Sequence, residues 1–196
     1  NGYGVDGKPG ITNQFTYGDV DFFLLDNRYN RTPQFDKLEK QILGEDQINW
    51  LVAALKSSKA SFKLVAVGGQ VLNSSAIFEN HEVFKKEKET LISKLKAENI
   101  EGVVFLTGDR HHTELSKYVD SDGFTLYDLT VSPLTSSPTK FNDEANKFRV
   151  KDTKIHERNY AIIDVIGPLE NRTLEIVIFN KMGEMLWNNR ININDF

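Results

Sequence analysis

Apolar and polar positions alternate in blocks along the first two thirds of the chain. Short apolar runs that end in glycine or in polar residues predict buried strands at residues 19–27, 61–70, 103–106 and 123–133. Two longer stretches carry apolar residues at helical spacing and predict helices over 44–58 and 80–100. The apolar face of the first helix contains Ile48, Leu51 and Leu55, and that of the second contains Val83, Phe84, Leu91, Ile92 and Leu95.

The last part of the chain has a different pattern. Three closely spaced segments, 159–167, 172–180 and 183–194, alternate as strands do, and the turn NKMGE joins the last two. The order of elements predicts an α/β fold with an antiparallel extension, in a single domain over residues 1–196. Residues 139–158 are polar and without a period, and we expect them to form a mobile loop over the site.

Composition excludes several classes of protein. The 196 residues are 39% hydrophobic and 27% charged, with a net charge of −4. These values are typical of a globular domain, and the absence of a basic block argues against a nucleic-acid surface. There is no apolar run of membrane-spanning length and no signal peptide. The chain has no cysteine, which excludes disulfides and thiolate metal sites.

The first 15 residues are rich in glycine and asparagine and do not begin with methionine. We interpret them as a surface connection within a longer protein, so that the chain is a fragment. A scar from an expression tag is the alternative.

Polar side chains follow three of the predicted strands. In open α/β sheets, ligands bind beyond the carboxyl ends of the strands, so these positions are candidates for a site. The three groups are Asp26 with Asn27 and Arg28, Gly69 with Gln70 and Asn73, and Asp109 with His111 and His112.

The segment GDRHH offers the clearest chemistry. Asp109 and His111 are two residues apart on a predicted sharp turn, so a carboxylate and an imidazole can point at one divalent metal ion. His112 would point elsewhere, toward substrate or toward a supporting carboxylate such as Glu114. The alternative is that Gly108 and Asp109 form a plain turn and the histidines lie on the surface.

Other residues are open to simpler interpretations. Arg28 and Arg31 could hold an anionic group through paired hydrogen bonds, or could form ion pairs with Asp26 or an acidic helix end. We expect His81 and His156 on the surface, and Trp50 and Trp187 in the core.

Five blocks occur in a distinctive order: YGDVDFFLLDNRYNR, LGEDQINWLVAAL, FKLVAVGGQVLN, GVVFLTGDRHHTEL and LYDLTVSPLTSSP. Together they resemble the C-terminal half of the PhoD-like alkaline phosphatase/phosphodiesterase family, within the calcineurin-like metallophosphatases, over roughly residues 15 to 140.

The resemblance implies the C-terminal half of a four-layer αββα sandwich that ends in antiparallel strands. It implies a two-metal or mixed-metal site, with Fe, Ca, Zn or Mn as candidates, that hydrolyses phosphate esters. GDRH looks like the counterpart of the G-H-x-H motif, which makes His111 and Asp109 the expected metal ligands. His112 and Arg28 are then the expected catalytic residues, and Arg28, Gln70 and Asn73 the expected substrate-binding residues. The family also implies an extracytoplasmic location.

The chain departs from the family pattern in two respects. The GGQVLN segment has no histidine, where many metallophosphatases place one. The early motifs, a D-x-H on the first strand, a bridging aspartate and a G-N-H/D segment, do not occur here, so we expect the missing N-terminal half of the domain to be a partner of this chain. A non-catalytic binding or structural module is the alternative function. An unrelated α/β domain is a third possibility, which would be favoured if Asp26, Gln70 and Asp109 lay far apart.

Overall fold

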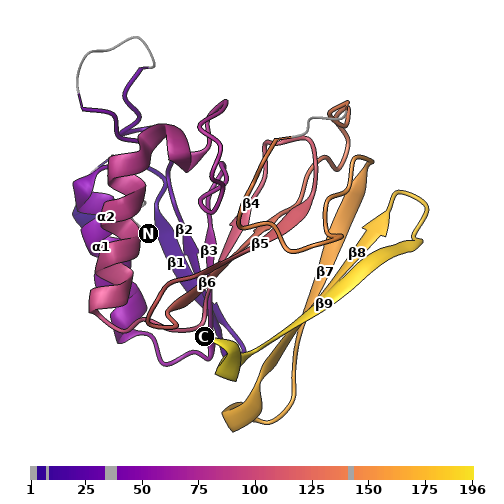
Figure 1. Cartoon of the computed structure of the whole chain (residues 1–196). Helices are drawn as coiled ribbons and strands as arrows, with labels where there is room; N and C mark the ends of the chain where they lie inside the picture. Colours follow the sequence, from indigo (N-terminus) through magenta and orange to yellow (C-terminus); the bar gives the residue numbers. More distant parts are fainter. Residues whose placement is uncertain (1–3, 8, 34–38, 141–143) are drawn as a thin grey trace.

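A computed structural model describes residues 4–7, 9–33, 39–140 and 144–196. Two helices cover one face of a six-stranded sheet, and a three-stranded antiparallel sheet covers its other face (Figure 1). One apolar core lies between the helices and the large sheet, and a second lies between the two sheets. Among the described residues, no helix has the length and apolar character needed to cross a membrane.

The large sheet has the strand order β1-β2-β3-β4-β6-β5. β2, β3, β4 and β6 run parallel, and the edge strands β1 and β5 are antiparallel to their neighbours. The bounds are Asn13–Tyr17 for β1, Val20–Leu24 for β2, Phe62–Ala66 for β3, Val103–Thr107 for β4, Glu114–Val119 for β5 and Thr125–Thr130 for β6. Because both faces of this sheet are covered, its inner strands are apolar runs without alternation, and every residue of β6 is buried.

The small sheet has the order β7-β8-β9, with bounds Asn159–Ile166, Thr173–Asn180 and Met185–Asn192. Its strands do alternate: along β8, buried residues such as Leu174, Ile176 and Ile178 face the second core. The antiparallel meander predicted from the sequence is therefore confirmed.

The helices lie where the pattern predicted them. α1 spans Glu45–Ser57, and α2 spans Lys85–Ala97 after a 3-10 turn at His81–Phe84. The buried residues of α1 include all three predicted core positions. The carboxylate of Glu87 in the first turn of α2 accepts hydrogen bonds from the backbone N–H groups of Ile42, Leu43 and Gly44, which joins the start of α2 to the start of α1.

Two strands were not predicted. β1 consists entirely of exposed residues, so it has no apolar run to reveal it. β5 begins with Glu114, Leu115 and Ser116, and the polar side chains of Glu114 and Ser116 are buried in a hydrogen-bonded network rather than facing water.

Three predictions about individual segments change. The prediction that His81 lies on the surface is wrong, because the residue is only 1% exposed. Burial, together with the charge of nearby Lys88, lowers the pKa of His81 to about 3. His156 is half-buried rather than exposed. The described part of the expected mobile loop is anchored, with Glu144, Asn146 and Thr153 buried; residues 141–143 lie outside the described residues. Trp50 and Trp187 are partly buried, each against one of the two cores.

Gly102 precedes β4 and lies beside the start of the neighbouring strand β3, where its carbonyl accepts from the backbone N–H of Lys63 at 2.8 Å. Its φ is +74°, and a Cβ there would lie 2.1 Å from the carbonyl oxygen of Ser61. We expect Gly102→Ala to lower the free energy of unfolding by at least about 2 kcal/mol, through left-handed backbone strain and displacement of β3. Urea unfolding followed by tryptophan fluorescence measures it. Gly123→Ala is the matched control, since φ is +90° and no atom lies within 4 Å. Equal losses in the two variants would contradict the packing argument.

Candidate active site

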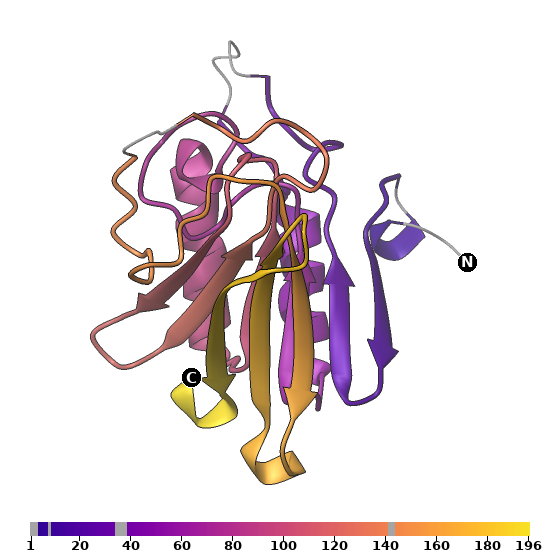
Figure 2. The ribbon, with the colours of Figure 1, turned by 90° about the vertical axis from the view of Figure 1, so that its right-hand side faces the viewer.

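The connections that follow the parallel strands gather at one end of the large sheet, the upper end in both ribbon views (Figures 1 and 2). Beyond the strands, the backbone N–H of Val67 donates to the carbonyl of Leu106 at 3.0 Å, and that of Gly108 donates to Gly68 at 3.3 Å. A Cβ on Gly68 would lie 2.6 Å from the side-chain amide of Asn27, so the Asp26 group also lies here. The three strand ends therefore meet, which removes the observation that would have favoured an unrelated domain.

The GDRHH segment leaves β4 in a strained turn. Asp109 and His111 both have positive φ values, 66° and 57°, which are uncommon for residues other than glycine and cluster at functional sites. Asp109 is exposed and His111 is half-buried. Both line a pocket of about 470 Å³, whose other lining residues are Phe78, Glu79, Arg110 and Thr139.

The ring of His111 is oriented by the backbone. Its Nδ1 lies 2.6 Å from the carbonyl oxygen of Ser137. Because a carbonyl only accepts, Nδ1 carries the proton and Nε2 of the neutral ring keeps its lone pair. Metal-binding histidines are commonly held in this way by a carbonyl on the opposite nitrogen. The donor chemistry of His111 with Asp109 therefore fits a metal ion.

Arg28 reaches the same region through Glu79. Its guanidinium donates to the Glu79 carboxylate at 2.6 Å, and Arg31 contacts the other oxygen at 2.8 Å. The ion pair predicted for the arginines thus forms with Glu79, whereas Asp26 accepts from the backbone N–H groups of Arg28 and Tyr29. The Arg28 side chain is 58% exposed, so exchanging Glu79 for another anion costs little.

Gln70 and Asn73 lie below this surface, both fully buried. The Gln70 amide donates to Glu114 and to Thr130, each at 2.8 Å, and its oxygen accepts from Asn73 at 2.8 Å and from Arg110. Their described contacts make them supports of the GDRHH turn, and contact with substrate stays a prediction.

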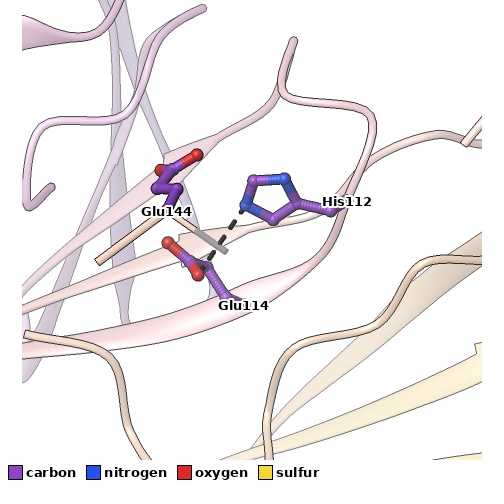
Figure 3. A group of neighbouring side chains, drawn as sticks. All are labelled: His112, Glu114 and Glu144. Atoms are coloured by element: carbon purple, nitrogen blue, oxygen red, sulfur yellow. Dashed lines mark ion pairs between the residues drawn. The ribbon is translucent and has the colours of Figure 1, made fainter. Parts of the chain in front are cut away.

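His112 turns away from His111 into the interior. It forms a buried group with Glu114 and Glu144, in which one donor atom from each residue lies within 4.8 Å of the others (Figure 3). His112 Nε2 lies 3.7 Å from the Glu114 carboxylate, and neither ring nitrogen has a hydrogen-bond partner among the residues that the structure describes. The expected approach of His112 to Glu114 is therefore present, and its catalytic role stays a prediction.

This buried group is already balanced in charge. Glu114 pairs with Arg149, and Glu144 pairs with Arg110, whose side chain is 4% exposed. Burial opposes ionisation of Glu114, but His112, Arg149 and Asn146 together hold its pKa well below the usual range. A dication placed here would have to displace the two guanidinium groups that already pair with Glu114 and Glu144.

The side chain of Asp128 on β6 connects the segment that follows β3 with the end of β4. Its carboxylate accepts from the backbone N–H groups of Val71 and Leu72, at 2.7 and 2.8 Å, and from the Thr107 hydroxyl at 2.6 Å. Burial outweighs these hydrogen bonds and, with the nearby Glu114 charge, raises the pKa of Asp128 to about 6.

The sequence analysis did not identify Arg110, Glu144, Arg149 or Asp128. Asp128 lies between Tyr127 and Leu129, and a charged residue between apolar neighbours was a usable signal for it, whereas Arg110 lies among the polar residues of GDRHH. Glu144 and Arg149 lie in a polar segment where nothing local distinguishes them.

These features define a metallophosphatase-like α/β fold with a candidate site at the carboxyl ends of its parallel strands. A solved structure of PhoD matches 94% of this chain and 44% of its own chain, with a TM-score of 0.66 and 17% identity. The model of the PhoD-like phosphatase family matches residues 5–171, and the chain belongs to this family. It spans less than half the length of the solved PhoD chain. No curated protein matches the chain.

The raised pKa of Asp128 makes stability depend on pH. Between about pH 4 and 6 the folded state keeps a proton that the unfolded state has lost, so this group's contribution is full below pH 4 and falls as pH rises through 6. We expect Asp128→Asn to remove this decline, which amounts to up to about 3 kcal/mol. Subtracting the unfolding free energy of the variant from that of wild type at each pH isolates the contribution of Asp128 from those of the other carboxyl groups. Asp164→Asn, at an exposed β7 position, is the control; parallel pH curves for Asp128→Asn and wild type would disprove the assignment.

Proposed function

We propose that this chain carries the C-terminal share of the active site of a metal-dependent phosphoric ester hydrolase. The observation that carries the proposal is the meeting of Asp109 and His111 in one pocket at the strand ends. Membership of the PhoD-like phosphatase family supports phosphate esters as the substrate.

Asp109 and His111 would hold the metal, through a carboxylate oxygen and Nε2. A bound metal ion supplies Lewis acidity to the phosphoryl group and lowers the pKa of water. Membership of the family supports metal binding, and the carboxylate of Asp109 and the oriented ring of His111 in one pocket support these two residues as the ligands. Fe, Ca, Zn and Mn remain the candidates for its identity.

Arg28 would bind a phosphoryl oxygen after releasing Glu79, because an exposed ion pair contributes little to stability. His112 would act through Glu114, by fixing the position of the turn that carries His111. Gln70 and Asn73 would hold the same turn from below through Arg110.

Two donors are too few for a two-metal site, so the remaining ligands would come from another part of a longer protein. We propose that residues 1–196 form part of one such domain, with its N-terminal half as partner. The length match of 44% to the solved PhoD chain supports this. An extracytoplasmic location and the choice between monoesters and diesters remain predictions from the family.

The ligand assignment predicts the effect of two substitutions in the intact protein, meaning the longest natural polypeptide that contains this sequence. We expect Asp109→Asn and His111→Ala each to reduce bound metal at least about tenfold, with a parallel loss of hydrolysis, because each removes a ligand. Metal content by mass spectrometry and p-nitrophenyl phosphate hydrolysis measure the two effects.

Asp152→Asn is a matched control for Asp109→Asn, since Asp152 is exposed with a φ of 61° and lies outside the pocket. Unchanged metal content and hydrolysis in both site variants would refute the assignment of Asp109 and His111 as ligands. An intact wild-type protein that binds no metal and hydrolyses no ester would refute the hydrolase assignment and favour a non-catalytic module.

The shared-site hypothesis predicts that the isolated 196 residues bind metal weakly and hydrolyse esters far more slowly than the intact protein. The expected deficit is at least about 100-fold, because an incomplete ligand set cannot hold the metal in place. Hydrolysis of p-nitrophenyl phosphate and bis-p-nitrophenyl phosphate, with added divalent or ferric ions, tests it. Equal rates for the two proteins would show that the chain carries a whole site.

A further inference from the structure

Phe78 occupies an unusual position beside the proposed site. It lies in the connection after β3, is 62% exposed and has a φ of 51°. A positive φ at a bulky residue is strained and persists only where the surroundings enforce it. An exposed ring gains little burial in return. Such an arrangement calls for an explanation beyond folding.

The connection that carries Phe78 is firmly held. The carbonyl oxygen of Glu79 lies so close to Gly69 that a Cβ there would be 2.8 Å away. The backbone N–H of His81 donates to the carbonyl of Gln70 at 2.8 Å. The amide of Asn80 donates to the carbonyl of Ser75 at 2.6 Å, which closes the loop beneath Phe78. The ring is therefore presented on a fixed backbone.

Arg110 supports the ring. Its guanidinium carbon lies 5.3 Å from the centroid of the Phe78 ring, within the range of a cation–π contact. Arg110 is itself fixed by Glu144 and Gln70 below. Phe78 therefore stands on a buried, immobile base, and it lines the same pocket as Asp109 and His111.

We propose that Phe78 is a specificity-determining residue that stacks against the ester group of the substrate and selects phosphate esters of aromatic or other flat, unsaturated alcohols. The inference rests on the proposed function, because the phosphoryl group is placed at Asp109 and His111. Those two residues and Arg28 supply polar and charged groups for the phosphoryl end. Phe78 is the aromatic wall of the pocket, so it takes the organic end.

The test compares aryl and alkyl esters in the intact protein. The substrates are phenyl phosphate and ethyl phosphate, together with diphenyl and diethyl phosphate. We expect Phe78→Ala to raise KM for the phenyl esters about three- to tenfold, the loss of one aromatic stacking contact, and to change KM for the ethyl esters less than about twofold. Phe78→Tyr keeps the ring and should retain the wild-type preference.

Phe15→Ala is the matched control, because Phe15 is also an exposed phenylalanine, at 48%, but lies on the edge strand β1 outside the pocket. Inhibition by inorganic phosphate, which has no ester group, should be the same in Phe78→Ala and wild type. Equal changes for phenyl and ethyl esters, or no change in either, would overturn the proposal. An unchanged KM for both kinds of ester would also be expected if another part of the intact protein covered Phe78.

A separate measurement distinguishes failure of this proposal from failure of the proposed function. If the wild-type intact protein hydrolyses none of these esters, the hydrolase assignment fails. Calorimetric binding of phenylphosphonate and ethylphosphonate, which cannot be hydrolysed at the P–C bond by this chemistry, then tests Phe78 alone. A phenyl preference that Phe78→Ala abolishes supports the aromatic contact, and its absence in wild type overturns it.

Discussion

Two ion pairs connect the parts of the chain that form the candidate site: Arg110 with Glu144, which is buried, and Arg149 with Glu114, in which the carboxylate is buried and the arginine partly exposed. Arg110 belongs to the turn after β4, Glu114 begins β5, and Glu144 and Arg149 belong to the connection before β7. Buried charges are tolerated only when each is matched and hydrogen-bonded, so loss of one partner would leave an isolated charge in the interior. This requirement fixes the described end of a long polar connection against the GDRHH turn, and the position of His111 depends on it.

The division of the two adjacent histidines follows from the same constraint. The chain leaves β4 through two positive φ values, at Asp109 and His111, and then enters β5. His112 therefore faces the buried carboxylates, while His111 faces the pocket and is oriented by the Ser137 carbonyl. The paired charges of the interior give the exposed turn a fixed base. Arg110 also lines the pocket of Asp109 and His111, but its charge is already paired with Glu144.

Much of the fold was predictable because its elements are buried in regular ways. The apolar runs of β2, β3, β4 and β6, the apolar faces of α1 and α2 and the alternation of β8 follow directly from which faces are covered. β1 and β5 were missed for opposite reasons. β1 is exposed throughout and held by pairing with β2 alone, whereas β5 buries polar side chains whose partners are distant in sequence. His81 was misplaced because its polar neighbours gave no sign that the 3-10 turn packs inward.

The sequence by itself determined the class of fold, the family resemblance and the strand ends at which polar residues gather, since these depend on local periodicity and short motifs. Only the tertiary structure decided which polar residues meet. Glu114 finds Arg149 across 35 positions and Asn73 finds Glu144 across 71, and such pairings depend on strand order and not on spacing. The exposure of Phe78 was likewise decided in three dimensions, because the loop that closes on Gly69 holds its ring outward on Arg110.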